Sequence, residues 1–209
     1  MPSPGPRQPE ERLVQSERSP LQPGLYYHIY GRGNSGEPLF REERNYSYFL
    51  KLYAKYTEPV AATYAYCLLS NHYHFLVRIL ETGPVSETGP VLDPSRHFNN
   101  LFIAYAKAFN KAYSRTGALF ESPFRRKVVE NDRYFTALIA YIHRNPQKHG
   151  FVDDFREWPY SSYQAILSSG LSRIQRATVL DWFNGRDGFE EAHRSAVDEA
   201  VIELLIAED

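Results

Sequence analysis

The 209-residue sequence predicts an α+β fold in which four antiparallel strands form one sheet and helices cover one face of it. Two observations support this prediction. Segments with alternating apolar and polar residues are interleaved with segments whose apolar residues recur at helical spacing. These segments follow the order strand, helix, strand, strand, helix, strand, and 43% of the residues are hydrophobic, which is enough for one core.

Local patterns give the boundaries of the elements. Residues 1–24 are rich in Pro, Gly, Ser and charge, so they are expected to form a disordered N-terminal tail. Residues 81–94 contain the tandem repeat ETGPV-S-ETGPV and are expected to form a loop. The expected strands cover residues 25–32, 60–69, 72–80 and 124–130, and the expected helices cover residues 42–56, 95–115 and 132–145.

Two connections shape this arrangement further. Ser70 and Asn71 join the second and third strands, a link short enough for a hairpin. The third helix is expected to end at Asn145, because Pro146 lacks an amide hydrogen and disfavours a helical residue before it. The first six elements are in the order of a ferredoxin-like split βαβ unit, which predicts an antiparallel sheet with helices on one face.

The chain divides into three expected parts. The disordered tail is followed by a main domain over residues 25–150 and an acidic, helical C-terminal extension over residues 151–209. The extension is expected to contain helices near residues 158–167, 176–183 and 189–207, with a turn over residues 184–188.

Charge is distributed unevenly along the chain. The formal net charge is only −1, but residues 1–150 carry 19 Lys and Arg against 13 Asp and Glu, a net of +6. Residues 151–209 carry 5 basic and 12 acidic residues, a net of −7. A basic body of this kind suggests a polyanionic partner, although a solvated helix face beside an acidic surface helix would give the same pattern.

Composition also argues against several classes of protein. The chain has no apolar run long enough for a bilayer and no apolar N-terminal signal, which predicts a soluble, cytoplasmic protein with no membrane partner. The single cysteine, Cys67, excludes an internal disulfide and a multi-cysteine zinc site, and its apolar strand pattern favours a core position.

A histidine pair opens the third expected strand. His72 and His74 are two residues apart, so their side chains point to the same face and could share one ion. The apolar residues from Tyr73 to Ile79 form the opposite row, which places the histidines off the main core face. Alone the motif is a weak signal, because two imidazoles rarely complete a coordination sphere.

The third expected helix offers a possible complement. Tyr141 and Asn145 are four residues apart and therefore lie one turn above the other, at the edge of the apolar face. An amide at such a position is unusual, because burial without partners is costly. Spacing alone leaves the alternatives open that Asn145 caps the helix end, that Tyr141 is a core aromatic, and that Tyr134 competes for its role.

Several motifs occur together in a fixed order, over roughly Leu25 to Leu167. They are YHIYGRGN at residues 27–34, YCLLSNHYHFLV at 66–77, AFNK at 108–111, RTGALF at 115–120, YIHRNP at 141–146 and WPYSSY at 158–163. In this combination the chain resembles the HUH single-tyrosine transposases, specifically the REP-associated tyrosine transposases. A departure is QKHG after the proline, where the family more usually has VRAG.

The resemblance implies a role for each residue. Tyr141 would be the nucleophile, and His72, His74 and Asn145 would hold a divalent metal, Mg²⁺ or Mn²⁺. It also implies the activity, which is cleavage and rejoining of single-stranded DNA at hairpin or repeat ends through a 5′-phosphotyrosine. By the same resemblance the partner is single-stranded DNA with hairpin structure, and the protein is a monomer or a homodimer.

Basic residues are candidates for contacts with the DNA backbone. Arg125, Arg126 and Lys127 form a triplet in the fourth expected strand. Arg32 and Arg144 both lie within motifs of the resemblance. Each of them could equally be a solvated surface charge.

Three other functions compete with a DNA strand transferase. The first is a domesticated, non-catalytic protein that binds nucleic acid on the same fold. The second is a ferredoxin-like RNA-binding module, which would need aromatic residues where His72 and His74 stand. The third is a metal-dependent hydrolase that uses water in place of Tyr141 and forms no covalent adduct.

Overall fold

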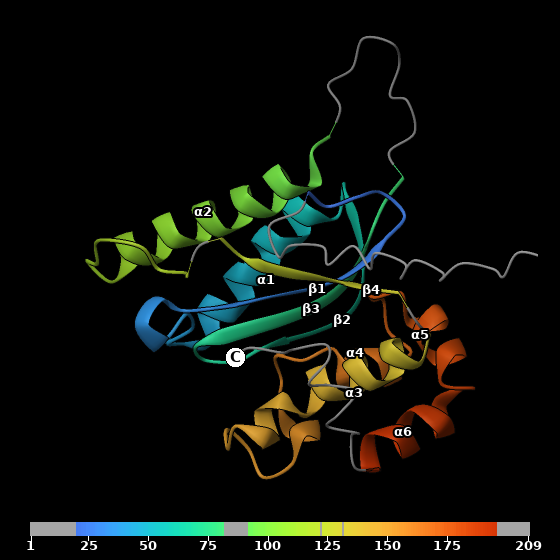
Figure 1. The fold of residues 1–209 in the computed structure, drawn as a ribbon. Helices are drawn as coiled ribbons and strands as arrows, with labels where there is room; N and C mark the ends of the chain where they lie inside the picture. Colours follow the sequence, from blue (N-terminus) through green and yellow to red (C-terminus); the bar gives the residue numbers. More distant parts are fainter. Residues whose placement is uncertain (1–19, 82–91, 122, 131, 196–209) are drawn as a thin grey trace, which may run out of the picture.

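A computed structural model describes residues 20–81, 92–121, 123–130 and 132–195. Its centre is one antiparallel sheet in the order β2-β3-β1-β4 (Figure 1). The strands are β1 (Tyr26–Arg32), β2 (Ala61–Leu68), β3 (His72–Ile79) and β4 (Arg125–Val129). The α+β prediction and the predicted hairpin of β2 and β3 are therefore confirmed.

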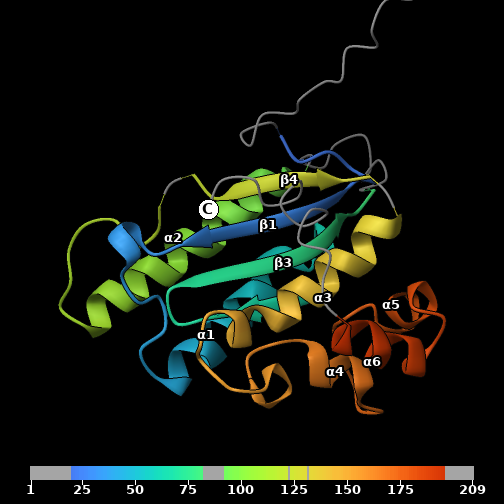
Figure 2. The ribbon, with the colours of Figure 1, turned by 60° about the horizontal axis from the view of Figure 1, so that its bottom comes forward.

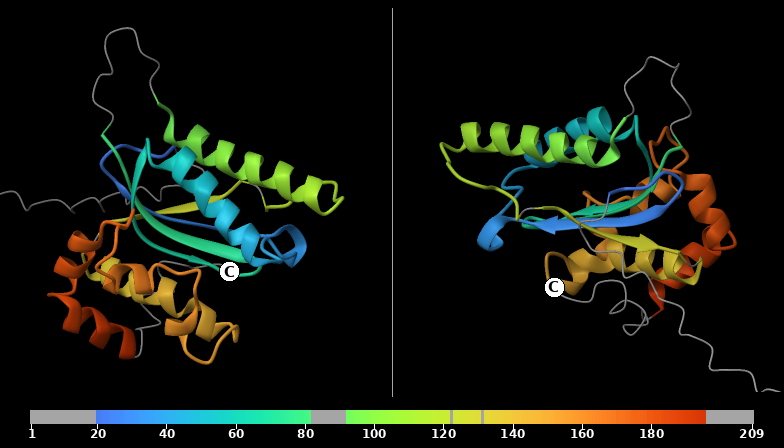
Figure 3. Two further views of the ribbon diagram at one scale, coloured as in Figure 1. Left: turned by 180° about the vertical axis from the view of Figure 1, so that it is seen from behind. Right: turned by 45° about the horizontal axis from the view of Figure 1, so that its top comes forward.

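Two helices cover one face of the sheet, as the ferredoxin-like order predicted. They are α1 (Glu43–Thr57) and α2 (Pro94–Ala112), which lie side by side in Figures 1 and 3. Phe49 of α1 and Phe98 of α2 are fully buried, and the apolar row of β3 completes this core. Asp93 caps α2 by accepting a hydrogen bond from the Ser95 amide, and the short 3-10 helix η1 spans Asn34–Gly36.

The opposite face of the sheet carries α3 (Asp132–Lys148), which packs on β2 and β3 and runs alongside β3 in Figure 2. Outside it are η2 (Phe155–Glu157), α4 (Tyr163–Leu167), α5 (Arg176–Trp182) and α6 (Arg186–Arg194). A second hydrophobic core joins these layers, with Leu76 from the sheet, Ile142 from α3, and Tyr163 and Phe189 from the C-terminal segment. Residues 151–195 thus pack on α3 and also bond directly to β2, where Leu68 N donates to the Tyr160 carbonyl and Gln175 N donates to the Thr63 carbonyl.

Four local predictions were wrong. The helix expected near residues 158–167 covers only α4, because the residues before it bond to β2, with Leu68 N donating to the Tyr160 carbonyl at 2.9 Å. Helix α3 continues past Pro146, because the missing amide hydrogen deprives only one carbonyl of a partner while later amides still bond, His149 N to Asn145 O at 3.0 Å. The turn expected over 184–188 is shorter, since α6 begins at Arg186. The last residues of the predicted tail are ordered, because Leu21 is buried and its amide donates to Ser95 Oγ.

Other predictions fall outside the described residues. The tandem repeat lies almost entirely at positions 82–91, the tail largely at 1–19, and the end of the last predicted helix at 196–209. Within the described ranges, no helix is both long and apolar enough to cross a membrane.

Candidate active site

The site lies between the start of β3 and the end of α3. Strand alternation turns Tyr73 toward α1 and α2 and turns His72 and His74 toward α3. Because α3 crosses beneath them, the ring of Tyr141 meets the ring of His74 at a centroid distance of 5.6 Å, nearly edge to face. The two histidine rings are 5.3 Å apart and almost perpendicular. His74 is 2% exposed, so this second face is also a buried one.

Asn145 joins this group one turn after Tyr141. Its side-chain nitrogen donates to the Tyr141 carbonyl at 3.3 Å, which orients the amide and turns Oδ1 toward His72. Oδ1 then lies 3.3 Å from His72 Nε2. The other ring nitrogen of His72, Nδ1, lies 2.8 Å from Asn71 Oδ1. Asn145 is fully buried and does not merely cap the helix end, because α3 continues beyond it.

Both polar partners of the His72 ring are therefore carbonyl oxygens, which only accept hydrogen bonds. Burial lowers the pKa of His72 to about 4, and the contact with Asn145, which raises the pKa, offsets only part of this effect. The ring is therefore neutral near pH 7 and carries one N–H. If Nδ1–H donates to Asn71, the lone pair of Nε2 faces the lone pairs of Asn145 Oδ1. A cation between two such acceptors would stabilise this arrangement.

The Nε2 atom of His74 is a second ring nitrogen that faces the site. This Nε2 is buried and has no hydrogen-bond partner among the described residues, whereas Nδ1 of the same ring lies 3.0 Å from His28 Nε2. Burial lowers the pKa of His74 well below its usual value, and the nearby rings of His28, His72 and His149 lower it further. A neutral imidazole with a buried, unpartnered nitrogen is a suitable metal ligand.

The residues at this site fit a divalent ion of the Mg²⁺ or Mn²⁺ kind. Two imidazole nitrogens and one amide oxygen form a mixed donor set, and two histidines suit Mn²⁺ somewhat better than Mg²⁺. Across the described ranges, no group of three or more His, Cys, Asp or Glu side chains is placed to hold a metal. The third protein ligand would therefore be the amide of Asn145, and substrate or water oxygens would supply the rest.

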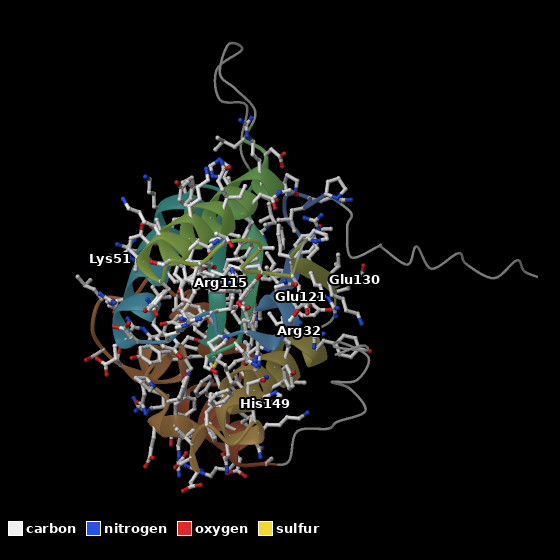
Figure 4. All side chains as sticks on the ribbon, turned by 90° about the vertical axis from the view of Figure 1, so that its left-hand side faces the viewer. Arg32, Lys51, Arg115, Glu121, Glu130 and His149 are labelled. Atoms are coloured by element: carbon white, nitrogen blue, oxygen red, sulfur yellow. The ribbon has the colours of Figure 1, made fainter. Side chains whose placement is uncertain are left out.

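A cavity of about 310 Å³ opens beside the histidines. His72 and His74 form part of its wall, with Arg32, Glu121 and His149 nearer the surface (Figure 4). Arg32 Nε donates to Glu121 at 2.8 Å across it. Tyr141 is 5% exposed and does not itself line the cavity, and the Lys148 ammonium lies 5.5 Å from the centre of its ring.

The predicted basic residues do not form one surface. Arg32 and Arg125 line the cavity, and Lys127 is on the same face of β4 as Arg125 by strand alternation. Arg126 faces the other way, where its guanidinium lies 4.9 Å from the Phe124 ring centre and donates to Ser95 Oγ.

Arg144 lies apart from the other four. It donates to the carbonyl of Ser195, which follows α6, and lines a different cavity together with His193. The structure therefore brings Arg32, Arg125 and Lys127 toward the site and leaves the other two elsewhere.

Tyr134 lies two turns of α3 away from Tyr141. It is half-buried and packs against the second core, seven residues or about 10 Å along the helix from Tyr141. The geometry thus distinguishes two tyrosines that spacing alone could not.

Sequence reasoning missed three residues of the site, namely His28, Asn71 and His149. Asn71 lies inside the motif at residues 66–77. His149 follows the motif at 141–146 and extends the i, i+4 row of Tyr141 and Asn145 by one more turn. His28 shares its strand face with Tyr30, which pairs with His74 across the sheet. Alternation along β1 could have placed His28 on the same face as Tyr30. It could not have placed His28 beside His74, because that also requires the pairing of β1 with β3.

Two kinds of comparison with known proteins, by sequence and by structure, find similarity to REP-associated tyrosine transposases. No family model matches the chain. A putative REP-associated tyrosine transposase of Haemophilus influenzae is 27% identical over 111 residues, which are 52% of this chain and 62% of the relative. The REP-associated tyrosine transposase of Escherichia coli is 29% identical over 68 residues, 32% of this chain and 41% of the relative. Both matches span less than two thirds of the relative's length.

A solved structure shares the fold. A REP-associated tyrosine transposase bound to a REP hairpin superposes with a TM-score of 0.58 at 17% identity, over 76% of this chain and 88% of the other. The resemblance that the motifs indicated is thereby confirmed.

Proposed function

From its similarity to REP-associated tyrosine transposases, we propose that this chain is a metal-dependent enzyme that cleaves and rejoins single-stranded DNA. One observation carries the proposal. Packing of α3 on β3 brings Tyr141 and Asn145 to the pair His72 and His74, although some seventy residues of chain separate them.

Each side chain has a distinct task in the proposed reaction. The Tyr141 oxygen attacks the scissile phosphorus in line and loses its proton to solvent as the 5′-phosphotyrosine bond forms. The 3′-oxygen leaves with the electron pair of the broken P–O bond and takes up a proton to become a hydroxyl. His72, His74 and Asn145 would hold a divalent ion, which when bound polarises the phosphate oxygens as a Lewis acid. The Asn145 amide keeps its oxygen aimed at His72 through its bond to the Tyr141 carbonyl.

The covalent intermediate makes rejoining possible. It conserves the energy of the phosphodiester, so the 3′-hydroxyl of a second strand can attack the phosphotyrosine and release Tyr141. Strand transfer then needs no additional energy source. A water-dependent hydrolase on the same residues would lose this property.

Basic side chains at the cavity support a DNA substrate. Arg32 and Arg125 line the cavity and Lys127 lies on the same strand face, which suits contacts with the phosphates on both sides of the cleaved bond. The structurally similar transposase is bound to a REP hairpin, and this supports a hairpin end as the substrate here. An RNA-binding module is less well supported, because α3 packs on the sheet face where such modules stack bases.

The proposal predicts a covalent protein–DNA adduct. The protein is incubated with labelled single-stranded hairpins and Mn²⁺, denatured and analysed on a gel. We expect an adduct that disappears in Tyr141→Phe and with a chelator, because both the nucleophile and the ion are required. Tyr134→Phe is the matched control on the same helix and should retain the adduct.

Two outcomes would contradict the proposal. Cleavage without an adduct would indicate the water-dependent hydrolase. Binding of a hairpin that is never cleaved, with wild type and Tyr134→Phe alike, would indicate a domesticated, non-catalytic DNA-binding protein.

A further inference from the structure

His28 of β1 is a buried histidine that the reaction as described does not use. Its side chain is 0% exposed, and its ring lies nearly parallel to those of His74 and Tyr30, with centroid distances of 5.2 and 4.6 Å. Its Nε2 is 3.0 Å from Nδ1 of His74, the nitrogen that faces away from the proposed metal position. His28 is thus the hydrogen-bond partner of a proposed metal ligand.

The pair allows only two proton arrangements, because each neutral imidazole carries one N–H. In the first, His74 Nδ1–H donates to His28 Nε2, and His74 Nε2 presents a lone pair. In the second, His28 Nε2–H donates to His74 Nδ1, and His74 Nε2 carries a hydrogen that blocks metal binding. Water cannot replace His28 as the partner, because the His28 ring is completely buried.

The buried nitrogens at the two ends of the pair leave these arrangements closely balanced. His74 Nε2 and His28 Nδ1 both lack a hydrogen-bond partner among the described residues. Each arrangement therefore leaves one N–H and one lone pair unsatisfied. A cation at His74 Nε2 satisfies the lone pair of the first arrangement only and selects it.

We propose that His28 is a positioning residue that accepts the His74 Nδ1–H hydrogen bond and so holds His74 in its metal-binding tautomer. Metal binding then draws the pair into one proton arrangement without a net gain or loss of protons by the two rings. This inference rests on the proposed function, since it presupposes that His74 binds the ion.

Metal affinity is the direct test, measured by calorimetry with Mn²⁺ alone. We expect His28→Phe to bind Mn²⁺ about 10- to 100-fold more weakly, the usual effect of losing such a supporting partner. His28→Gln should recover part of the affinity, because its side-chain oxygen can accept from His74 Nδ1. The control is His193→Gln, which alters another buried histidine pair, with His143, and should leave Mn²⁺ affinity unchanged.

A tautomer measurement separates positioning from general stability. In ¹⁵N-labelled wild type saturated with Mg²⁺, nitrogen shifts of the His28 ring should show Nε2 without hydrogen and Nδ1 protonated. A protonated His28 Nε2 in the metal-bound protein would overturn the inference even if His28→Phe failed to fold.

An absent metal site and an incorrect role for His28 would give different results in these experiments. If wild type binds no Mn²⁺ or Mg²⁺, the proposed metal site is wrong and the role of His28 is wrong with it. If wild type binds Mn²⁺ and His28→Phe binds it equally well, only the role of His28 is wrong.

Discussion

Gly31 illustrates how a single residue permits the geometry of the site. It lies opposite Tyr73 in the β1–β3 ladder, and a Cβ built on it would lie 2.5 Å from the Tyr73 hydroxyl and 2.9 Å from the ring. Tyr73 is the bulky residue between the two histidines and is 1% exposed, so its ring cannot swing into solvent. The lack of a side chain at Gly31 therefore allows Tyr73 to fill the core while His72 and His74 face α3.

Gly31→Ala is predicted to destabilise the protein by about 1–3 kcal/mol, because the added methyl group overpacks a buried ring. Urea denaturation of wild type and variant measures the change in the free energy of unfolding. Gly170→Ala is the matched control, since a Cβ there meets nothing within 4 Å. Equal stability of the two variants would show that the Tyr73 ring relaxes freely.

Helix α3 is the element that connects the site to the C-terminal segment. One of its faces carries Tyr141 and Asn145 toward the sheet, and His143 points the other way. His143 Nδ1 lies 2.8 Å from His193 of α6, and its Nε2 lies 2.7 Å from Ser162 Oγ, just before α4. Helices α4 and α6 are thus bonded to the back of the helix that carries Tyr141, the proposed nucleophile.

This buried pair predicts a loss of stability in mild acid. Burial lowers the pKa of His143 well below its usual value and that of His193 to about 4, whereas both return to about 6.5 on unfolding. The unfolded chain therefore binds more protons between pH 6.5 and 4, and stability falls as pH decreases through that range. Melting temperatures from pH 7.5 to 4.5 measure this decline.

The decline of melting temperature with pH, compared between wild type and a variant, tests whether His143 and His193 cause the acid sensitivity. His193→Gln should melt lower than wild type at pH 7.5 but lose less on acidification, because one titrating ring is gone. The other histidines with a lowered pKa, His28, His72 and His74, remain in both proteins and contribute equally to both slopes. Parallel slopes would mean that this pair does not cause the acid sensitivity.

At the scale of the whole molecule, one chain contains every element of the proposed site. Helix α3 packs on β2 and β3 of its own sheet, so Tyr141 reaches His74 within the same chain. From this arrangement we predict that a single chain is an active unit, which corresponds to the monomer among the two oligomeric states expected from the resemblance. A dimer that exchanged its α3 helices would instead combine residues from two chains.

Mixing two inactive variants tests that assignment. Tyr141→Phe lacks the proposed nucleophile and His72→Ala lacks a proposed metal ligand, so neither should form the DNA adduct. Their equimolar mixture should also form none, because each chain assembles its own defective site. Adduct formation at about a quarter or more of the wild-type level would indicate exchange of α3 between chains.

Much of the fold and part of the site could be predicted because they depend on local periodicity. Strand alternation alone places His72 and His74 on one face, and helical spacing alone stacks Asn145 on Tyr141. Element order alone suggested the ferredoxin-like sheet, which the structure has. Strand alternation and helical spacing follow from backbone geometry over a few residues. The residue patterns that they require can therefore be read from the sequence alone.

Only the tertiary structure decided which faces meet. The contact of His72 with Asn145 spans 73 residues, and that of His28 with His74 spans 46, so both depend on packing that local patterns do not encode. The same packing selects Tyr141 over Tyr134 and separates Arg126 and Arg144 from the cavity. The sequence determined which residues share a face, whereas packing between distant segments determined which of those faces form the site.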